Sequence, residues 1–67
     1  MSVHKAEAEQ ARVNTLKIIR AAVRLKHSIA ADNELNEVLP EAEMRFDSAV
    51  QRGKLPSPVE IKRAVGL

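Results

Sequence analysis

The sequence contains no cysteine, tryptophan or tyrosine, and it has only one phenylalanine, two glycines and two histidines among 67 residues. The absence of cysteine excludes disulfides, thiolate zinc sites and cysteine nucleophiles, and it is typical of a reducing cytoplasm. His4 and His27 alone are too few for a histidine-rich metal site. A single aromatic side chain, Phe46, cannot form a stacking platform for the bases of single-stranded nucleic acid.

Long apolar runs are also lacking. The first ten residues carry charges at Lys5, Glu7 and Glu9, where a signal peptide needs an apolar run. Uncharged apolar stretches such as residues 21–23 are far shorter than the roughly 20 residues of a membrane-spanning helix. We therefore expect a cytoplasmic protein that does not enter a membrane.

The remaining composition, 45% apolar and 30% charged, suits one small domain over residues 1–67 with a frayed start at residues 1–5. A chain of this length buries only about 60% of the surface that its unfolded form exposes. Because disulfides and metals are excluded, a partner chain is the remaining way to bury more surface.

The net charge of +2 hides three blocks of alternating sign. Residues 12–27 carry +5, residues 32–47 carry −5 and residues 52–63 carry +3. Two interpretations stay open: the blocks attract each other within the fold, or each block faces a different partner.

Residues from about Ala6 to Ile29 are predicted to form one long helix, because strong helix formers dominate and apolar residues recur at spacings of three and four. Leu16, Ile19 and Val23 widen this apolar arc enough for two neighbouring elements. The expected seam consists of Ala11, Thr15, Ile18, Ala22, Leu25 and Ile29.

A second helical region follows, with Asp32 or Asn33 as the residue that caps its start. Pro40 interrupts it, since a proline inside a helix removes one backbone hydrogen bond and presses on the carbonyl of Asn36. We therefore predict a short helical turn over residues 33–38 and a separate helix from about Pro40 to a stop at Gly53.

The last element has the clearest local signal. Ser57-Pro58-Val59-Glu60 is a capping box with proline at the first helical position, and it predicts a short helix from 58 to about 65 that Gly66 ends. No segment alternates with period two. The predicted fold class is all-α: a long N-terminal helix packed against a second amphipathic helix, with its preceding turn, and a short C-terminal helix.

Catalysis is not expected. The few hydroxyl side chains form no recognisable nucleophile arrangement with either histidine. Neighbouring acids such as Glu41 and Glu43 suit the start of a helix rather than acid–base chemistry. Two glycines cannot build a phosphate-binding loop. The sequence therefore predicts a protein with no catalytic residue, no metal and no cofactor.

Lys17, Arg20, Arg24 and His27 follow one ridge of the first helix at spacings of three, four and three, opposite the apolar seam. Such a row of like charges costs a helix some stability unless an anion lies alongside. We interpret Lys17, Arg20 and Arg24 as candidate nucleic-acid or anion contacts; a solvated face, or one paired with the acidic block, is the alternative. No helix-turn-helix spacing is present, so any DNA contact is expected to be non-specific and salt-sensitive.

Three short motifs lie between the first helix and the last. They are Asp32-Asn33-Glu34-Leu35, Ala42-Glu43-Met44-Arg45-Phe46, and Lys54-Leu55-Pro56-Ser57 followed by Val59. Together they resemble the Hha/YmoA family of small all-helical bacterial modulators that bind the nucleoid protein H-NS. The resemblance covers about residues 12–65, but Met44 and Glu43 replace a histidine and an aspartate, about three residues are missing before Lys54, and the family's aromatic residues are absent.

This resemblance implies a regulatory protein that binds an H-NS-type partner through the acidic position at Glu43, with basic residues such as Arg20 and Arg24 adding charge beside DNA. We take Arg45 and Phe46 of the same motif as further partner-binding candidates. Phe46 is at the same time the expected anchor between the helices, with a face that a partner could share.

A rival resemblance involves Ser28-Ile29-Ala30-Ala31-Asp32-Asn33, which is similar to the S-x-x-x-E-G/N motif of small antitoxins that block Fic-type toxins. It implies a toxin partner whose arginine pairs with Asp32, although Asp32 is one methylene shorter than the family's glutamate. Gly53-Lys54-Leu55 is similar to that family's G-E-L segment. A homo-oligomeric helical module encoded by a phage or plasmid, for example a homodimer, is the third alternative.

Overall fold

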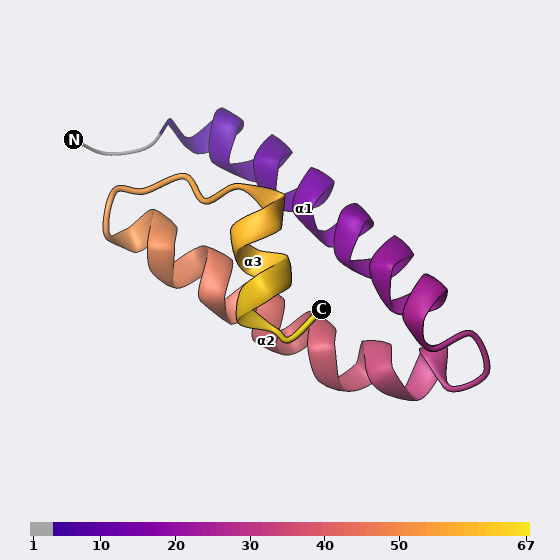
Figure 1. Cartoon of the computed structure of the whole chain (residues 1–67). Helices are drawn as coiled ribbons and strands as arrows, with labels where there is room; N and C mark the ends of the chain where they lie inside the picture. The colour runs from indigo at the N-terminus through magenta and orange to yellow at the C-terminus, as the bar shows by residue number, and fades with distance from the viewer. Residues whose placement is uncertain (1–3) are drawn as a thin grey trace.

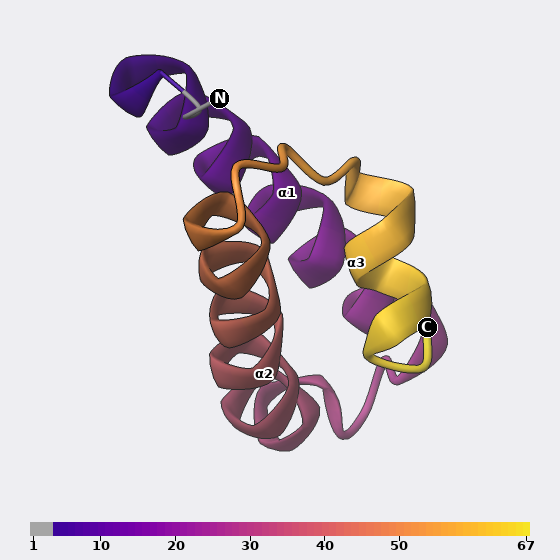
Figure 2. The same ribbon diagram turned by 90° about the vertical axis from the view of Figure 1, so that its left-hand side faces the viewer.

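The computed structural model describes residues 4–67, which form three helices: α1 over Lys5–Lys26, α2 over Ala31–Gln51 and α3 over Pro58–Ala64. α1 and α2 run in opposite directions, and the connection after α2 returns along α1 to α3 (Figure 1). In the turned view α2 and α3 lie on either side of α1, whose N-terminal turns extend beyond them at the upper left (Figure 2). The predicted all-α class is confirmed. The tail predicted at residues 1–5 lies partly outside the described residues, and Lys5 is already helical.

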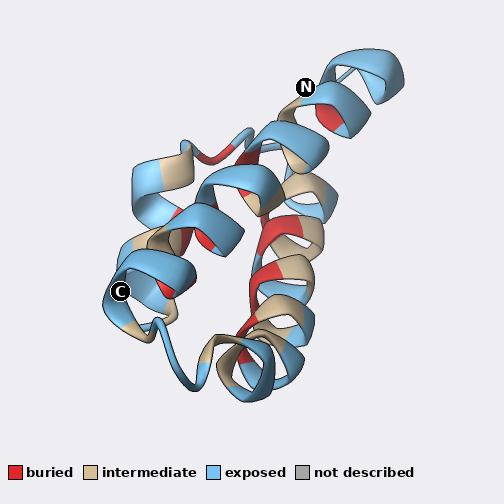
Figure 3. Ribbon diagram, turned by 90° about the vertical axis from the view of Figure 1, so that its right-hand side faces the viewer, coloured by how far each residue is buried: buried red, intermediate tan, exposed pale blue. Residues whose placement is uncertain are grey.

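The core lies where the three helices meet, and its residues appear on their inward-facing surfaces (Figure 3). Phe46 is its largest fully buried side chain, with 1% of its surface exposed. This burial confirms the predicted anchor role of Phe46. The buried cluster consists of Ile19, Val23, Val38, Ala42, Phe46 and Ile61.

The predicted seam of α1 is wrong at three of its six residues. Leu25 is 89% exposed, Ile29 is fully exposed, and Ile18 is also on the outside. The helix ends at Lys26, so Ile29 lies in the following turn. The buried face is centred on Ile19, between Val23 and Thr15, and Thr15 is the buried residue that it shares with the predicted seam. The centre of this face lies about 80° round the helix from the centre of the predicted seam, and it is the face that α2 and α3 cover together.

α2 is one continuous helix, which corrects the predicted break at Pro40. Pro40 and Asn36 are both exposed, so the carbonyl of Asn36 that loses its helical partner faces the solvent side. Val38 and Ala42, on either side of the proline, are both buried in the core. Packing of this face therefore outweighs the cost of the proline, because ending the helix there would expose the buried face.

The start of α2 also differs from the prediction. The residue that precedes the helix is Ala30, with no side-chain cap, and Asp32 lies exposed within the first turn. Asp32 therefore stabilises the start of α2 through the attraction between its negative charge and the positive end of the helix dipole, and it does not form a capping hydrogen bond.

The signals around α3 are confirmed. The Oγ of Ser57 accepts a hydrogen bond from the backbone N–H of Glu60 at 3.3 Å, which is one of the two bonds of a capping box; the return bond from Ser57 N–H to the Glu60 carboxylate is not formed within the described residues. Gly53 and Gly66 have φ values of 76° and 82°, a conformation that favours glycine, and they follow the ends of α2 and α3. Ile61 of α3 belongs to the buried core.

Replacing Thr15 with valine is expected to raise the free energy of unfolding by about 1 kcal/mol. Thr15 is buried, and its Oγ1 has no hydrogen-bond partner in the described part of the chain. Valine has nearly the same shape and removes that unsatisfied hydroxyl. Urea unfolding followed by circular dichroism measures the change. Thr15→Ser, which keeps the hydroxyl and loses the methyl group, should lower stability, and a stability loss in Thr15→Val would contradict this account.

Candidate functional site

The basic and acidic blocks meet at one cluster, where Arg12 of α1 binds Asp47 and Glu43 of α2. Arg12 Nε and Nη2 donate to the two carboxylate oxygens of Asp47 at 2.9 and 3.2 Å. Nη2 also donates to Oε2 of Glu43 at 3.3 Å. The acids are spaced i, i+4 and so lie on the same face of α2. Attraction between the blocks within the fold is therefore present, and Arg12 carries it.

The hydrogen bond to Asp47 raises the pKa of Arg12 above its ordinary value, the charges of Asp47 and Glu43 add to this rise, and desolvation opposes it. While Asp47 and Glu43 carry their charges, the ion pairs of Arg12 stabilise the fold at pH values below the ordinary arginine pKa, and this stabilisation is lost as the pH rises above it. Arg12 is therefore charged throughout the physiological range. Because the three side chains are 35–49% exposed, solvent screens their attraction to about 0–1 kcal/mol per pair.

Glu43 keeps one side of its carboxylate available. Its Oε2 contacts Arg12, whereas Oε1 takes part in no hydrogen bond with residues 4–67. An ionised carboxylate has about four acceptor positions. A second guanidinium could therefore bind Glu43 without displacing Arg12.

The four predicted partner-binding residues are not brought together. Phe46 is in the core and offers a partner no surface. Arg45 points to another side of α2, where its Nε donates to Oε1 of Glu41 at 3.1 Å. Asp32 precedes Glu43 by 11 positions, about 16 Å along the helix. Only Glu43 belongs to the cluster with Arg12.

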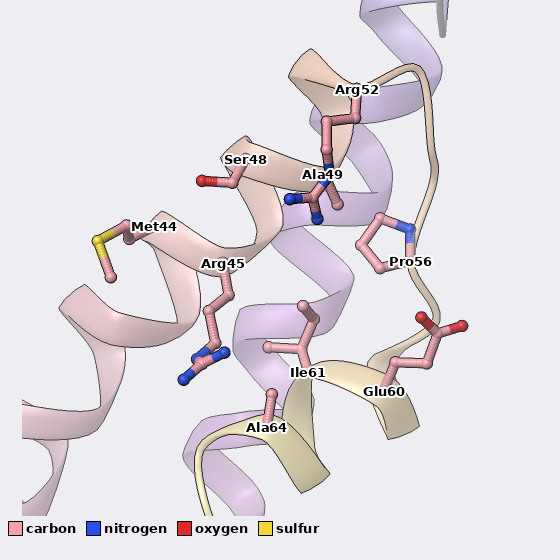
Figure 4. Close-up of a pocket in the computed structure, with 9 residues that line it drawn as sticks. All are labelled: Met44, Arg45, Ser48, Ala49, Arg52, Pro56, Glu60, Ile61 and Ala64. Atoms are coloured by element: carbon pink, nitrogen blue, oxygen red, sulfur yellow. The ribbon is translucent and has the colours of Figure 1, made fainter.

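Sequence reasoning missed an open groove of about 420 Å³ between α2 and α3, with Ala49, Pro56 and Ile61 at its base (Figure 4). Arg45 and Arg52 line its α2 side and Glu60 its α3 side. Pro56 is buried. No pattern in the sequence indicates this groove, since it depends on how α3 crosses α2.

The predicted basic ridge lies on the outside of α1. Lys17, Arg20 and Arg24 are exposed, and none of them forms an ion pair within the described residues. His27 departs from the ridge: it is half-buried, follows the last residue of α1 and donates its backbone N–H to the carbonyl of Val23 at 2.7 Å. The acidic block neutralises Arg12 and leaves these three cations to solvent or a ligand.

Residues 4–67 contain neither a metal-binding cluster nor a membrane-spanning helix. No group of three or more His, Cys, Asp or Glu side chains in this range is placed to hold a metal ion. No helix in the same range is long and apolar enough to cross a membrane.

Comparison with family models, with curated proteins and with solved structures gave no match to this chain. The resemblance to the Hha/YmoA family therefore remains a prediction from short motifs.

Proposed function

We propose that this chain is a non-catalytic regulatory protein of the bacterial cytoplasm that acts by binding a partner protein, with an H-NS-type nucleoid protein as the partner. One observation carries the proposal: the carboxylates of Glu43 and Asp47 already hold a guanidinium, and Glu43 has an oxygen left for another. Glu43 is also the position to which the family resemblance assigns partner contact. An arginine of the partner is the expected ligand.

Charge-assisted hydrogen bonds between guanidinium and carboxylate are short and directional, and they give a small surface a specific orientation. Here Arg12 holds Glu43 in place, so less side-chain freedom is lost when a partner binds. Apolar side chains lie beside the cluster, where Ala8 and Val50 are among the residues that line an open pocket of about 250 Å³. A partner segment that pairs an arginine with a small apolar side chain would suit both features.

A weak, non-specific contact with DNA is the second part of the proposal. The cations at Lys17, Arg20 and Arg24 point away from the core and are not neutralised within the described fold. They lie on a different side of α1 from Arg12, so DNA and the partner need not overlap. In this arrangement the chain adds positive charge to the complex that its partner forms on DNA.

Glu43→Lys is expected to reduce binding to an H-NS-type oligomerisation domain at least tenfold, because it opposes an incoming arginine with a like charge. Isothermal titration calorimetry with the purified domain measures the affinity. Glu37→Lys is the matched control: it makes the same charge change at an exposed position of α2 that forms no ion pair within residues 4–67. Failure of the unmodified chain to bind at micromolar concentration, or equal loss in both variants, would contradict the proposal.

The antitoxin alternative has one observation in its favour. Asp32 is exposed and takes no part in an ion pair within the described residues, so its carboxylate is open to an arginine of a toxin. Ser28, however, lies in the turn before α2, and Asp32 lies within the helix, so the motif spans two kinds of structure. The Glu43 cluster is supported by contacts within the fold, and we place it first.

A further inference from the structure

The most unusual surface of the molecule is an aliphatic stripe on α1 and the turn after it. Ile18 and Leu25 are seven positions apart, which places them on one line of the helix, and Ile29 follows in the turn. Leu25 and Ile29 are the two most exposed of the large apolar side chains in the described range. Scattered exposed apolar residues are ordinary, but a row that repeats at helical spacing is a packing surface without a partner.

The protein's own fold does not cover this stripe. α2 and α3 both pack against the face of α1 that carries Ile19 and Val23. In a helix with 100° between residues, the line through Ile18 and Leu25 lies about 100–160° from the residues of that face. The described chain has no further helix to place there.

Positive charge runs along one edge of the stripe. Lys17 and Arg24 lie about 100° from Ile18 and Leu25, separated from them by the small residue Ala21. Both cations are exposed, and neither pairs with an acid of the described fold. A phosphate backbone would meet these cations but leave the aliphatic side chains uncovered, so DNA and an acidic helix would compete for Lys17 and Arg24. The combination fits a helix that has its own apolar stripe with carboxylates along the edge.

We propose that the stripe of Ile18, Leu25 and Ile29 binds an acidic amphipathic helix of a partner protein. The stripe covers 12 residues, so a partner helix of about three turns is long enough. Its apolar residues would cover Leu25 and Ile29, and its carboxylates would face Lys17 and Arg24.

A second copy of the chain suits the same stripe poorly. If two copies packed their α1 helices antiparallel, the edges with Lys17 and Arg24 would face each other. If they packed parallel, each such edge would face the side of α1 that carries Lys26, which is tied to the carbonyl of Gly66 at 3.2 Å. Both arrangements oppose like charges, which disfavours pairing.

Two labelled synthetic peptides of three heptads test the proposal, each with leucine at the a and d positions. One carries glutamate at e and g, and the other carries lysine there. Fluorescence anisotropy should show binding of the glutamate peptide and at least tenfold weaker binding of the lysine peptide. Leu25→Ser with Ile29→Ser should weaken binding of the glutamate peptide at least tenfold. Met44→Ser, which changes an exposed apolar residue of α2, should leave it unchanged.

A charge-reversal variant provides an independent test. Lys17→Glu with Arg24→Glu places negative charge along the edge of the stripe, so the lysine peptide should then bind more tightly than the glutamate peptide. The proposal is overturned if the glutamate peptide does not bind, or if the Met44 control loses as much affinity as the stripe variant. It is also overturned if the free chain sediments as a dimer that the stripe variant dissociates, or if anionic phosphatidylserine vesicles bind the stripe and the peptide does not. Glu43→Lys lies on another surface and should leave peptide binding unchanged, so this proposal and the proposed function can fail separately.

Discussion

Phe46→Ala is expected to leave the chain largely unfolded at 25 °C. Truncating a buried phenylalanine removes about 3–5 kcal/mol, from lost burial and from the cavity that remains. A single core in a chain below 70–80 residues rarely supplies more than about 3–5 kcal/mol in total. Phe46 is 1% exposed and belongs to the cluster in which all three helices take part. The neighbouring side chains could refill the space only by drawing the helices together.

The helical signal at 222 nm, recorded against temperature, measures this loss. Phe46→Leu, which keeps an apolar side chain of intermediate size, should remain folded with reduced stability. Met44→Ala is the surface control on the same helix, and it should change stability by no more than about 0.5 kcal/mol. A cooperative transition of Phe46→Ala at the temperature of the unmodified chain would show that the core does not depend on this ring.

Pro40→Ala is expected to have the largest stabilising effect, a gain of about 2 kcal/mol. Proline inside a helix costs about 3 kcal/mol relative to alanine. Part of that is offset because proline also restricts the unfolded chain, by about 0.4–1 kcal/mol. Pro40 lies at the tenth position of α2, and alanine there could donate to the carbonyl of Asn36. Pro40 is exposed, so the substitution leaves the core unchanged.

The midpoint of urea unfolding measures the gain. Pro58→Ala is the matched control, because Pro58 is the first residue of α3, where a missing N–H breaks no helical bond. It should change stability far less. If Pro40→Ala were neutral or destabilising, α2 would require the geometry that proline imposes in order to pack Val38 and Ala42 against α1.

Local signals in the sequence were sufficient for much of the fold. The capping box at Ser57 and the stop at Gly53 act within a few residues, so they do not depend on the rest of the chain. The face of α1 could not be assigned in this way. Its apolar residues cover a wide arc, and the spacing fits both the line through Ile18 and Leu25 and the line through Ile19 and Val23. Only the positions of α2 and α3 decide between them.

Pro40 is a second feature for which local sequence signals gave the wrong prediction. Its local cost predicts a helix end, but the burial of Val38 and Ala42 on the same face overrides that cost. The Arg12 cluster was equally beyond local reasoning, because its acids are 31 and 35 residues away. The charge blocks predicted that such a contact could form, but they did not indicate which cation would make it. Arg12 was the one whose place on α1 faces α2.

The burial of the sole aromatic ring determines how this protein can be observed. With no tryptophan or tyrosine, the chain absorbs little at 280 nm and has no indole or phenol fluorescence to report its state. The ring current of Phe46, however, should shift the methyl resonances of Ile19, Val23 and Ile61, which share its buried cluster. These shifts exist only when the three helices are assembled. The methyl groups of Leu25 and Ile29, exposed to solvent, should resonate near their unfolded positions until a ligand covers them. One methyl spectrum can therefore report folding and the occupancy of the α1 surface separately, without a label.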